Sequence, residues 1–521
     1  TDALNMEGAR KHLEGGEIEV QALLAGNDLL LYVDNVPRAI KAIKAALDAG
    51  RLTEAQLNAH VLRVLRWKAQ LVLPFPTPDP ARVQAELFRP EVFELRRRIY
   101  RAALTVCRNE GQLLPLSCAA ARRVLYVQTG YAKAAPFYDY LSRYGPVDYH
   151  YLPPEADEAA IREQVEAWKS QYSTVIVSTM NLNQKRSRAY GLSGNVVKLL
   201  QETAIARLPT VLVHFGNPYA LEYLGGETAT VVAYEERLET QEAAAEVIYG
   251  ALQPRGRLPV GVATRYEKAA PYDFRADRLA FGPPQAGELD STAYGRIDTI
   301  AQYYRQARAM PGCAVVALRG QHVVFAKGYG STEYEGGKPI DPLRTIYDLA
   351  SVTKVCATTL ALMRLHEHDS LDLEAPITKY LPELTNGAAV TVRMLLEHRS
   401  GYPAHIPFYL KTLKRKKHDP ELYAKVPGEY FNIPLAPDLF LHERYPEEVW
   451  RQVVKLEPKA KIEYVYSDIN LIILARVIEQ LTNRRLEDYL VEQFYGPLGM
   501  NYTCFLPAQK GIETVPSEID N

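Results

Sequence analysis

Four short apolar segments, regularly separated by helical ones, restrict the fold of the middle of this chain more than any other feature. They are VLYVQT (124–129), TVIVST (174–179), TVLVHF (210–215) and TVVAY (230–234). Continuous apolar runs of this length are typical of strands that are buried on both faces. Their alternation with helices predicts an open, mostly parallel sheet covered on both faces, an α/β sandwich over residues 86–265.

Residues 1–73 show the same alternation in fewer units. DLLLYV (28–33) is a short apolar run, as expected of a buried parallel strand, and apolar residues at helical spacing follow it over 36–47. Thr53 and Gln56 then form a T-x-x-Q capping box, which predicts the start of a second helix. We therefore expect this segment to be the end of a longer strand-and-helix fold.

Two irregular stretches divide the chain. PFPTPDP (74–80) places four prolines in seven residues, which ends the helical pattern and favours an extended spacer. The segment after the second stretch begins with a hairpin-like CAVVALRGQHVVFAKGYG (313–330) and continues into long helices, an α+β pattern. We predict domains at 1–73, 86–265 and 291–521, joined by linkers at 74–85 and 266–290.

Composition narrows the range of partners. The net charge of −1 over 521 residues gives no electrostatic reason to expect nucleic acid or an anionic membrane as a partner. The five cysteines lack CxxC spacing, and neither a P-loop nor a G-x-G-x-x-G motif occurs. No apolar run reaches the roughly 18 to 20 residues needed to cross a bilayer. We expect a small-molecule or oligosaccharide substrate, no metal, no cofactor and no membrane-spanning segment.

The motif SVTK places Ser351 and Lys354 one helical turn apart at the head of an apolar run, so that they share a face. A serine hydroxyl attacks an acyl group only with a base in contact, and a lysine can serve if its surroundings lower its pKa. The apolar Ala357 and Leu360 below it offer such surroundings. Because S-x-x-K should arise by chance about once in a chain of this length, the pair alone identifies no enzyme.

Three further segments occur in a specific order around this pair. They are TVRMLLEHRSGYP (391–403), YVYSDINLIILARVIEQL with Tyr466 at the start of a helix, and FYGPLGMNYT (494–503). Together with SVTK they resemble the serine β-lactamase-like family, which includes penicillin-binding carboxypeptidases, esterases and β-lactamases. The resemblance implies Ser351 as the acylated nucleophile, Lys354 as its base partner and Tyr466 as the group that passes a proton to the leaving atom.

The chain departs from that family at two points. Asp468 stands where the family's Tyr-x-Asn motif has an amide, and a nearby carboxylate favours a protonated lysine that stabilises charge. In addition, no Lys-Thr-Gly or His-x-Gly triplet occurs between Tyr466 and Asn521. We therefore expect the third domain of this 521-residue chain to be truncated, catalytically incomplete and poorly stable, so that a penicillin-type probe leaves it largely unacylated.

The opening TDALNM, the later AGNDLLLYV and LTEAQLNAHVLRVLRWK resemble the last barrel units of family-3 glycoside hydrolases, in particular bacterial β-N-acetylglucosaminidases. Residues 86–265, with HFGNPYALEYL and PRGRLPVGV, resemble the sandwich domain that follows that barrel. The resemblance implies a C-terminal remnant of a (β/α)8 barrel, in which Asp2 ends a strand and serves as the nucleophile of a retaining hydrolysis. The acid of that subgroup, a histidine, would precede Thr1. Glu235 and Glu236 are carboxylates near a strand end, but a surface role explains them more readily.

These resemblances predict an internal fragment of a two-enzyme fusion with a multidomain α/β and α+β fold. Its main activity would release terminal β-linked N-acetylglucosamine from cell-wall or chitin-type sugars, and peptidoglycan fragments are candidate substrates because they carry both this sugar and D-alanine peptides. A bacterial cell-envelope or periplasmic location follows from the resemblance alone. Two alternatives stay open: an esterase or D-alanyl peptidase with the sugar domain as a scaffold, and a third domain that only binds.

Overall fold

The computed structural model describes residues 1–71, 79–116, 123–262, 266, 272, 274–282, 292–436, 438–461 and 463–516. The chain forms two compact units, Thr1–Arg89 and Pro90–Asn521. Residues 74–78 of the first predicted linker and much of the second linker lie outside the described residues. The division into three domains stays a prediction.

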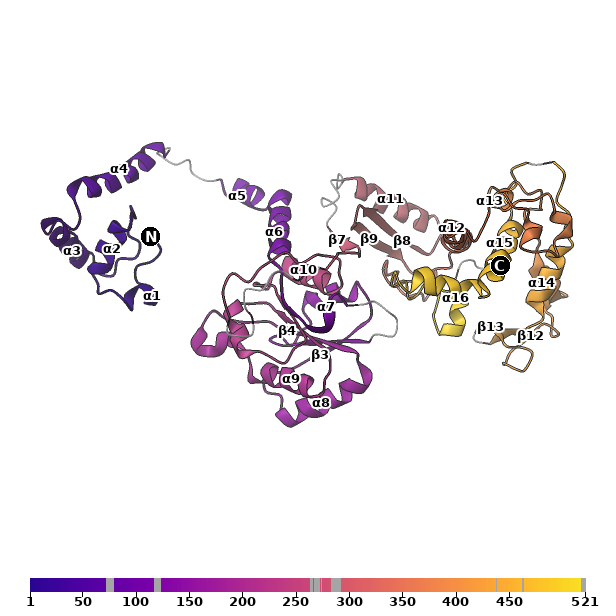
Figure 1. Ribbon diagram of the computed structural model, residues 1–521, viewed down its shortest axis with the longest axis horizontal. Helices are drawn as coiled ribbons and strands as arrows, with labels where there is room; N and C mark the ends of the chain where they lie inside the picture. Colours follow the sequence, from indigo (N-terminus) through magenta and orange to yellow (C-terminus); the bar gives the residue numbers. More distant parts are fainter. Residues whose placement is uncertain are drawn as a thin grey trace. The chain divides into compact units, whose positions relative to one another are not determined.

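The first unit is helical in its described part (Figure 1). The predicted capping box is confirmed, because Thr53 N donates to Gln56 Oε1 at 2.9 Å and Gln56 N donates to Thr53 Oγ1 at 3.2 Å. A small core forms from Val20, Leu23, Ala46 and Leu52. The helices are α1 (Glu7–Arg10), α2 (Glu17–Leu24), α3 (Val36–Asp48), α4 (Glu54–Gln70) and α5 (Pro80–Leu87).

The prediction of a strand at residues 28–33 is wrong. Among the described residues the segment makes one parallel bridge, between Leu31 and Ala3. A strand that is buried in a parallel sheet needs neighbours along its whole length, and here Leu29 is 65% exposed. The described residues of this unit therefore close no barrel.

A six-stranded sheet organises the first half of the second unit, in the order β1-β6-β5-β4-β2-β3. All neighbours run parallel except β1 and β6, so the expected mostly parallel sheet is confirmed. The four predicted strands are present. Two edge strands were not predicted, because TVCRN and VDYHY mix polar and apolar residues. The strands are β1 (Thr105–Asn109), β2 (Val124–Gln128), β3 (Val147–Tyr151), β4 (Thr174–Thr179), β5 (Thr210–His214) and β6 (Ala229–Val232).

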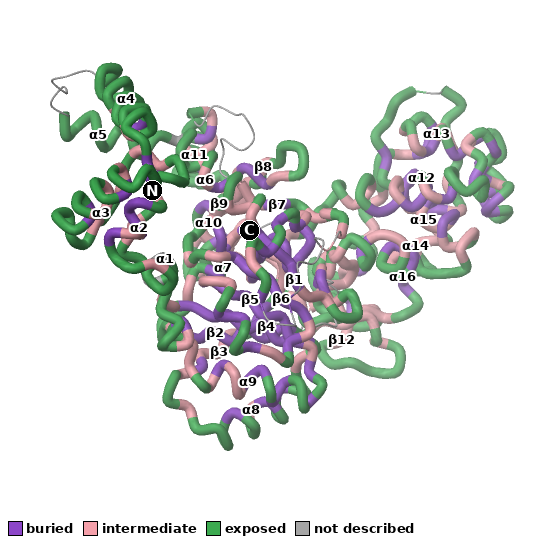
Figure 2. Tube along the Cα trace, turned by 60° about the vertical axis from the view of Figure 1, so that its left-hand side comes forward, coloured by how far each residue is buried: buried purple, intermediate pink, exposed green. Residues whose placement is uncertain are grey.

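Helices cover both faces of this sheet, and the four inner strands are buried along their whole length (Figure 2). Side chains of α7 (Pro136–Ser142) and α10 (Leu238–Ile248) pack in one core with one face of the strands. Side chains of α8 (Glu158–Gln171) and α9 (Gly194–Ile205) pack in a second core with the other face. This is the three-layer arrangement expected for an α/β sandwich.

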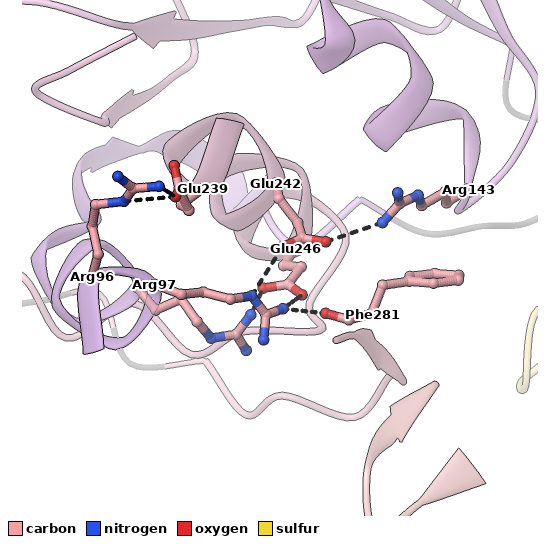
Figure 3. Close-up of polar contacts among 8 residues, drawn as sticks. Arg96, Arg97, Arg143, Glu239, Glu242, Glu246 and Phe281 are labelled. Atoms are coloured by element: carbon pink, nitrogen blue, oxygen red, sulfur yellow. Dashed lines mark hydrogen bonds and ion pairs between the residues drawn. The ribbon is translucent and has the colours of Figure 1, made fainter. Parts of the chain in front are cut away.

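An ion-pair cluster fastens α6 (Pro90–Ala103) to α10 (Figure 3). Arg101 pairs with Glu246, whose side chain is 1% exposed, and Arg97 donates to Glu242 Oε2 at 3.0 Å. Arg97 also donates to the carbonyl oxygen of Phe281. Burial raises the pKa of Glu246 to about 7, although Arg101 opposes this shift. Since buried charges are costly without partners, the arginines hold this helix pair together.

The remainder of the second unit combines a small sheet with helices. The predicted hairpin is confirmed as β8 (Gly312–Arg319) and β9 (His322–Gly330), with β7 (Ala280–Phe281) parallel to β9. A separate core joins α12 (Leu360–Glu367), α13 (Val392–Leu396) and α15 (Asp468–Thr482). None of the described helices has the length and hydropathy to cross a membrane. The other elements are α11 (Thr292–Gln306), the π-helix η5 (Lys354–Thr359), α12 (Leu360–Glu367), α13 (Val392–Leu396), β10 (Leu413–Lys414), β11 (Lys417–His418), β12 (Tyr423–Ala424), β13 (Ile433–Ala436), β14 (Leu439–Leu441), α14 (Tyr445–Val454), α15 (Asp468–Thr482) and α16 (Leu486–Leu490).

Candidate active site

Ser351 and Lys354 lie together, as their spacing predicts. Ser351 sits in an exposed turn that leads into η5, and Lys354 is the first residue of that π-helix. Lys354 Nζ donates to Ser351 Oγ at 2.8 Å. Single π-type turns occur often at functional sites, where they redirect side chains within a helix. The turn therefore holds a hydroxyl and an ammonium in direct contact at the surface.

Asp468 keeps the Lys354 side chain positively charged. The two side chains form an ion pair of 2.7 Å, and the Lys354 side chain is 17% exposed. Burial by itself lowers the pKa of Lys354, but its hydrogen bonds with Asp468 and Tyr466 outweigh burial and raise this pKa. The apolar surroundings expected to lower it are thus overridden by the carboxylate. Lys354 is a cation near neutral pH.

Tyr466 completes the group. Lys354 Nζ lies 5.0 Å from the centre of the Tyr466 ring. Hydrogen bonds with Ser351 and with Lys354 lower the pKa of Tyr466, against burial and the Asp468 charge. A phenol whose pKa is lowered beside a serine is closer to the range in which it can accept a proton.

The start of α15 fixes Tyr466 and Asp468. Ser467 is the N-cap of this helix, because its Oγ accepts the Asn470 N–H at 3.4 Å. The same hydroxyl donates to Pro403 O at 2.6 Å, and Asp468 N donates to Ala404 O at 2.7 Å. Ser-type caps satisfy free N–H groups at a helix start. The segment 391–403 and α15 therefore meet beside Ser351.

His398 also belongs to this group, although no role was predicted for it from the sequence. Its Nδ1 accepts the Ser467 N–H at 3.0 Å, and its ring centre lies 4.6 Å from that of Tyr466. Sixty-nine residues separate His398 from Ser467, so no local periodicity could reveal the contact. The available signal was the position of His398 within TVRMLLEHRSGYP.

A cavity of about 1570 Å³ adjoins the same turn. Leu349, Thr353 and Cys356 line it, whereas Ser351 and Tyr466 are not among its lining residues. Ser351 and Tyr466 are both exposed at the surface.

Asp2 lies in the other unit. Its Oδ1 accepts the Ala3 N–H at 2.8 Å, and its side chain is exposed. Thr1 N donates to Leu29 O at 3.1 Å, so Asp2 lies beside the segment expected to be a strand. The structure therefore does not bring Asp2 together with the Ser351 group within one unit.

Glu235 and Glu236 make contacts within the sandwich. Glu235 accepts the Tyr100 hydroxyl at 2.6 Å, and Glu236 accepts the Asn181 N–H at 2.7 Å. Among the described residues, no group of three or more histidines, cysteines or carboxylates has the geometry of a metal site.

Family models match the chain in three successive segments. Residues 1–67 match the glycosyl hydrolase family 3 N terminal domain, residues 104–330 its C-terminal domain, and residues 297–517 the beta-lactamase model. These matches confirm both resemblances found in the sequence.

Two curated relatives match part of the chain. An N-acetylmuramyl-L-alanine amidase of Bacillus subtilis (strain 168) is 29% identical over 221 residues, which are 40% of this chain and 45% of that protein. A putative D-alanyl-D-alanine carboxypeptidase of Salmonella gallinarum is 29% identical over 245 residues, 44% of this chain and 51% of that protein. The chain thus spans about half the length of these relatives.

Two solved structures align with parts of the chain. A glycoside hydrolase family 3 β-N-acetylglucosaminidase from Paenibacillus sp. is 23% identical with a TM-score of 0.34, covering 50% of each chain. The octameric penicillin-binding protein homologue from Pyrococcus abyssi is 28% identical with a TM-score of 0.31, covering 40% of this chain and 43% of its own.

Proposed function

We propose that this chain, in which glycosyl hydrolase family 3 domains are followed by a beta-lactamase domain, contributes to two hydrolytic centres. One centre transfers acyl groups to Ser351. The other releases terminal β-linked N-acetylglucosamine with Asp2 as nucleophile. The contact of Lys354 Nζ with Ser351 Oγ at 2.8 Å, beside a polarised Tyr466, is the observation that carries the first centre.

The acyl step follows from the charges at this centre. Ser351 Oγ attacks the substrate carbonyl carbon while its proton passes to the Tyr466 phenolate oxygen, which the Lys354 cation stabilises. Tyr466 then gives this proton to the leaving atom as its bond to the carbonyl carbon breaks. Water hydrolyses the resulting ester and restores the Ser351 hydroxyl. Asp468 keeps Lys354 charged throughout.

Two relatives of this chain are named as an N-acetylmuramyl-L-alanine amidase and a putative D-alanyl-D-alanine carboxypeptidase. We place the acyl substrate among alanine-containing peptides of this kind, including peptidoglycan fragments. Intact mass spectrometry of the natural protein at its full encoded length, after treatment with a penicillin-type probe, tests this centre. We expect one adduct in the wild type and none in Ser351→Ala; equal labelling of both would contradict the proposal.

The sugar centre rests on a separate observation. Asp2 belongs to the segment that matches the family 3 N terminal domain and lies beside residues 29–31. A nucleophilic carboxylate implies a two-step displacement with retention of configuration. Proton NMR of the first product formed from a β-N-acetylglucosaminide should therefore show the β-anomer. An initial α-anomer would rule out Asp2 as a nucleophile.

A further inference from the structure

We propose that His398 is a positioning residue that holds Tyr466 in the orientation needed for proton transfer. The inference rests on the proposed acyl-transfer function of Ser351. His398 binds the backbone on both sides of the tyrosine: its carbonyl oxygen accepts the Val465 N–H at 2.9 Å, and its Nδ1 accepts the Ser467 N–H at 3.0 Å. One residue thus binds the backbone N–H groups of the residue before Tyr466 and of the residue after it.

The imidazole also lies against the phenol ring. The ring centres are 4.6 Å apart, with 37° between the ring planes. Tyr466 is 45% exposed, so solvent alone would leave its ring free to move. Contact with a fixed imidazole restricts that motion on the side facing His398.

His398 is itself held in an unusual backbone conformation, with φ of +55°. Residues other than glycine rarely adopt positive φ, and such strain persists only where the surroundings impose it. Here Ser400 Oγ donates to Asn470 Oδ1 at 2.7 Å, and Asn470 Nδ2 donates to Leu395 O at 3.1 Å. Both side chains are buried. The loop is therefore tied to α15, the helix that begins with Asp468.

Gly401, three residues after His398, allows a further close backbone contact. Gly401 has φ of +80°, and a Cβ at this position would collide with the carbonyl oxygen of Lys459. The loop around His398 thus packs closely against Lys459, in the segment that leads to α15.

The hydrogen bond to Ser467 requires a neutral imidazole with an unprotonated Nδ1. Burial, and then the charge of Lys354, lower the pKa of His398, while Asp468 opposes this shift. Two other titratable side chains face the imidazole ring: Tyr466, and Tyr464, whose ring centre lies 6.1 Å from that of His398. Protonation would turn Nδ1 into a donor facing the Ser467 N–H. Acylation should therefore slow as the pH falls through the lowered pKa of His398.

Two substitutions separate positioning from mere packing. His398→Ala removes the acceptor, whereas His398→Asn can place Oδ1 near the position of Nδ1 and tolerates positive φ. In the full-length protein with p-nitrophenyl acetate, we expect His398→Ala to lower kcat roughly 10- to 100-fold with little change in KM. His398→Asn should restore most of this rate at neutral pH and remove the part of the acidic limb that comes from protonation of His398. His418→Asn, on an exposed hairpin, is the matched control.

Equal rates in wild type and both variants would overturn the inference, as would an equal loss in both. A second readout does not depend on turnover: the Tyr466 pKa measured by ¹³Cζ-tyrosine NMR, assigned with Tyr466→Phe. It should rise in His398→Ala and stay low in His398→Asn, and identical values in all three proteins would overturn the inference. If Ser351 is never acylated in the wild type while the NMR pattern holds, the proposed function fails and the positioning stands.

Discussion

Lys354 and Asp468 form an ion pair of 2.7 Å beside Ser351. The carboxylate keeps the lysine charged, so Lys354 donates to Ser351 Oγ and cannot take its proton. In the proposed mechanism the group that accepts that proton is Tyr466, whose pKa is lowered by its hydrogen bonds to Ser351 and Lys354. Replacing an amide by a carboxylate at this position thus assigns different tasks to the lysine and the tyrosine.

Asp468→Asn should move the basic limb of the acylation profile to lower pH. The lysine must be charged to stabilise the phenolate, and the substitution removes a hydrogen bond that raises its pKa. Rates of Ser351 acylation measured from pH 6 to 11 check this. Asp369→Asn, in an exposed turn, serves as control, and an unmoved basic limb in Asp468→Asn would contradict the role of the carboxylate.

Tyr466→Phe should lower acylation by about 10²- to 10⁴-fold, because it removes the group that carries the proton. The ring is retained, so its contact with His398 and the melting temperature should hardly change. Stopped-flow measurement with p-nitrophenyl acetate gives the rate, and Tyr409→Phe is an exposed control. A wild-type rate in Tyr466→Phe would exclude the tyrosine from the proton path.

Arg101→Ala should destabilise the sandwich by about 3 to 5 kcal/mol, because it leaves Glu246 buried with reduced compensation. Arg186→Ala, at an exposed ion pair in the same sandwich, should have no measurable effect. Urea unfolding followed by circular dichroism measures both changes. A loss as small as that in the control would show that the cluster contributes little.

The same glutamate predicts how this stability depends on pH. Burial raises the pKa of Glu246 to about 7, above its ordinary 4.5, so the folded state binds more protons than the unfolded state between these values. Stability from this group therefore falls as the pH rises through that window. The penalty of Arg101→Ala should be larger at pH 8 than at pH 5, and an equal penalty would contradict a titrating Glu246.

The four strands of the sheet that are continuously apolar could be predicted from the sequence. The edge strands Thr105–Asn109 and Val147–Tyr151 escaped prediction because one side of an edge strand contacts solvent and tolerates polar residues. Residues 28–33 have the pattern of a buried strand, yet a pattern cannot supply the neighbouring strands that burial requires.

The candidate site, too, could be predicted only in part from the sequence. Helical spacing was enough to pair Ser351 with Lys354, and a carboxylate at Asp468 was enough to expect a charged lysine. Helical or strand spacing could not reveal His398, because its contacts with Val465 and Ser467 depend on tertiary folding across many residues.

One comparison addresses the claim of two separate centres most directly. The natural protein at full length, Asp2→Asn and Ser351→Ala are each assayed with a chromogenic N-acetyl-β-glucosaminide and with p-nitrophenyl acetate. We expect Asp2→Asn to lose sugar hydrolysis by several orders of magnitude while keeping acyl transfer, and Ser351→Ala to show the reverse. A wild type inactive on the sugar, or an Asp2→Asn variant that still hydrolyses it, would contradict the sugar centre; acyl turnover that survives Ser351→Ala would contradict the other.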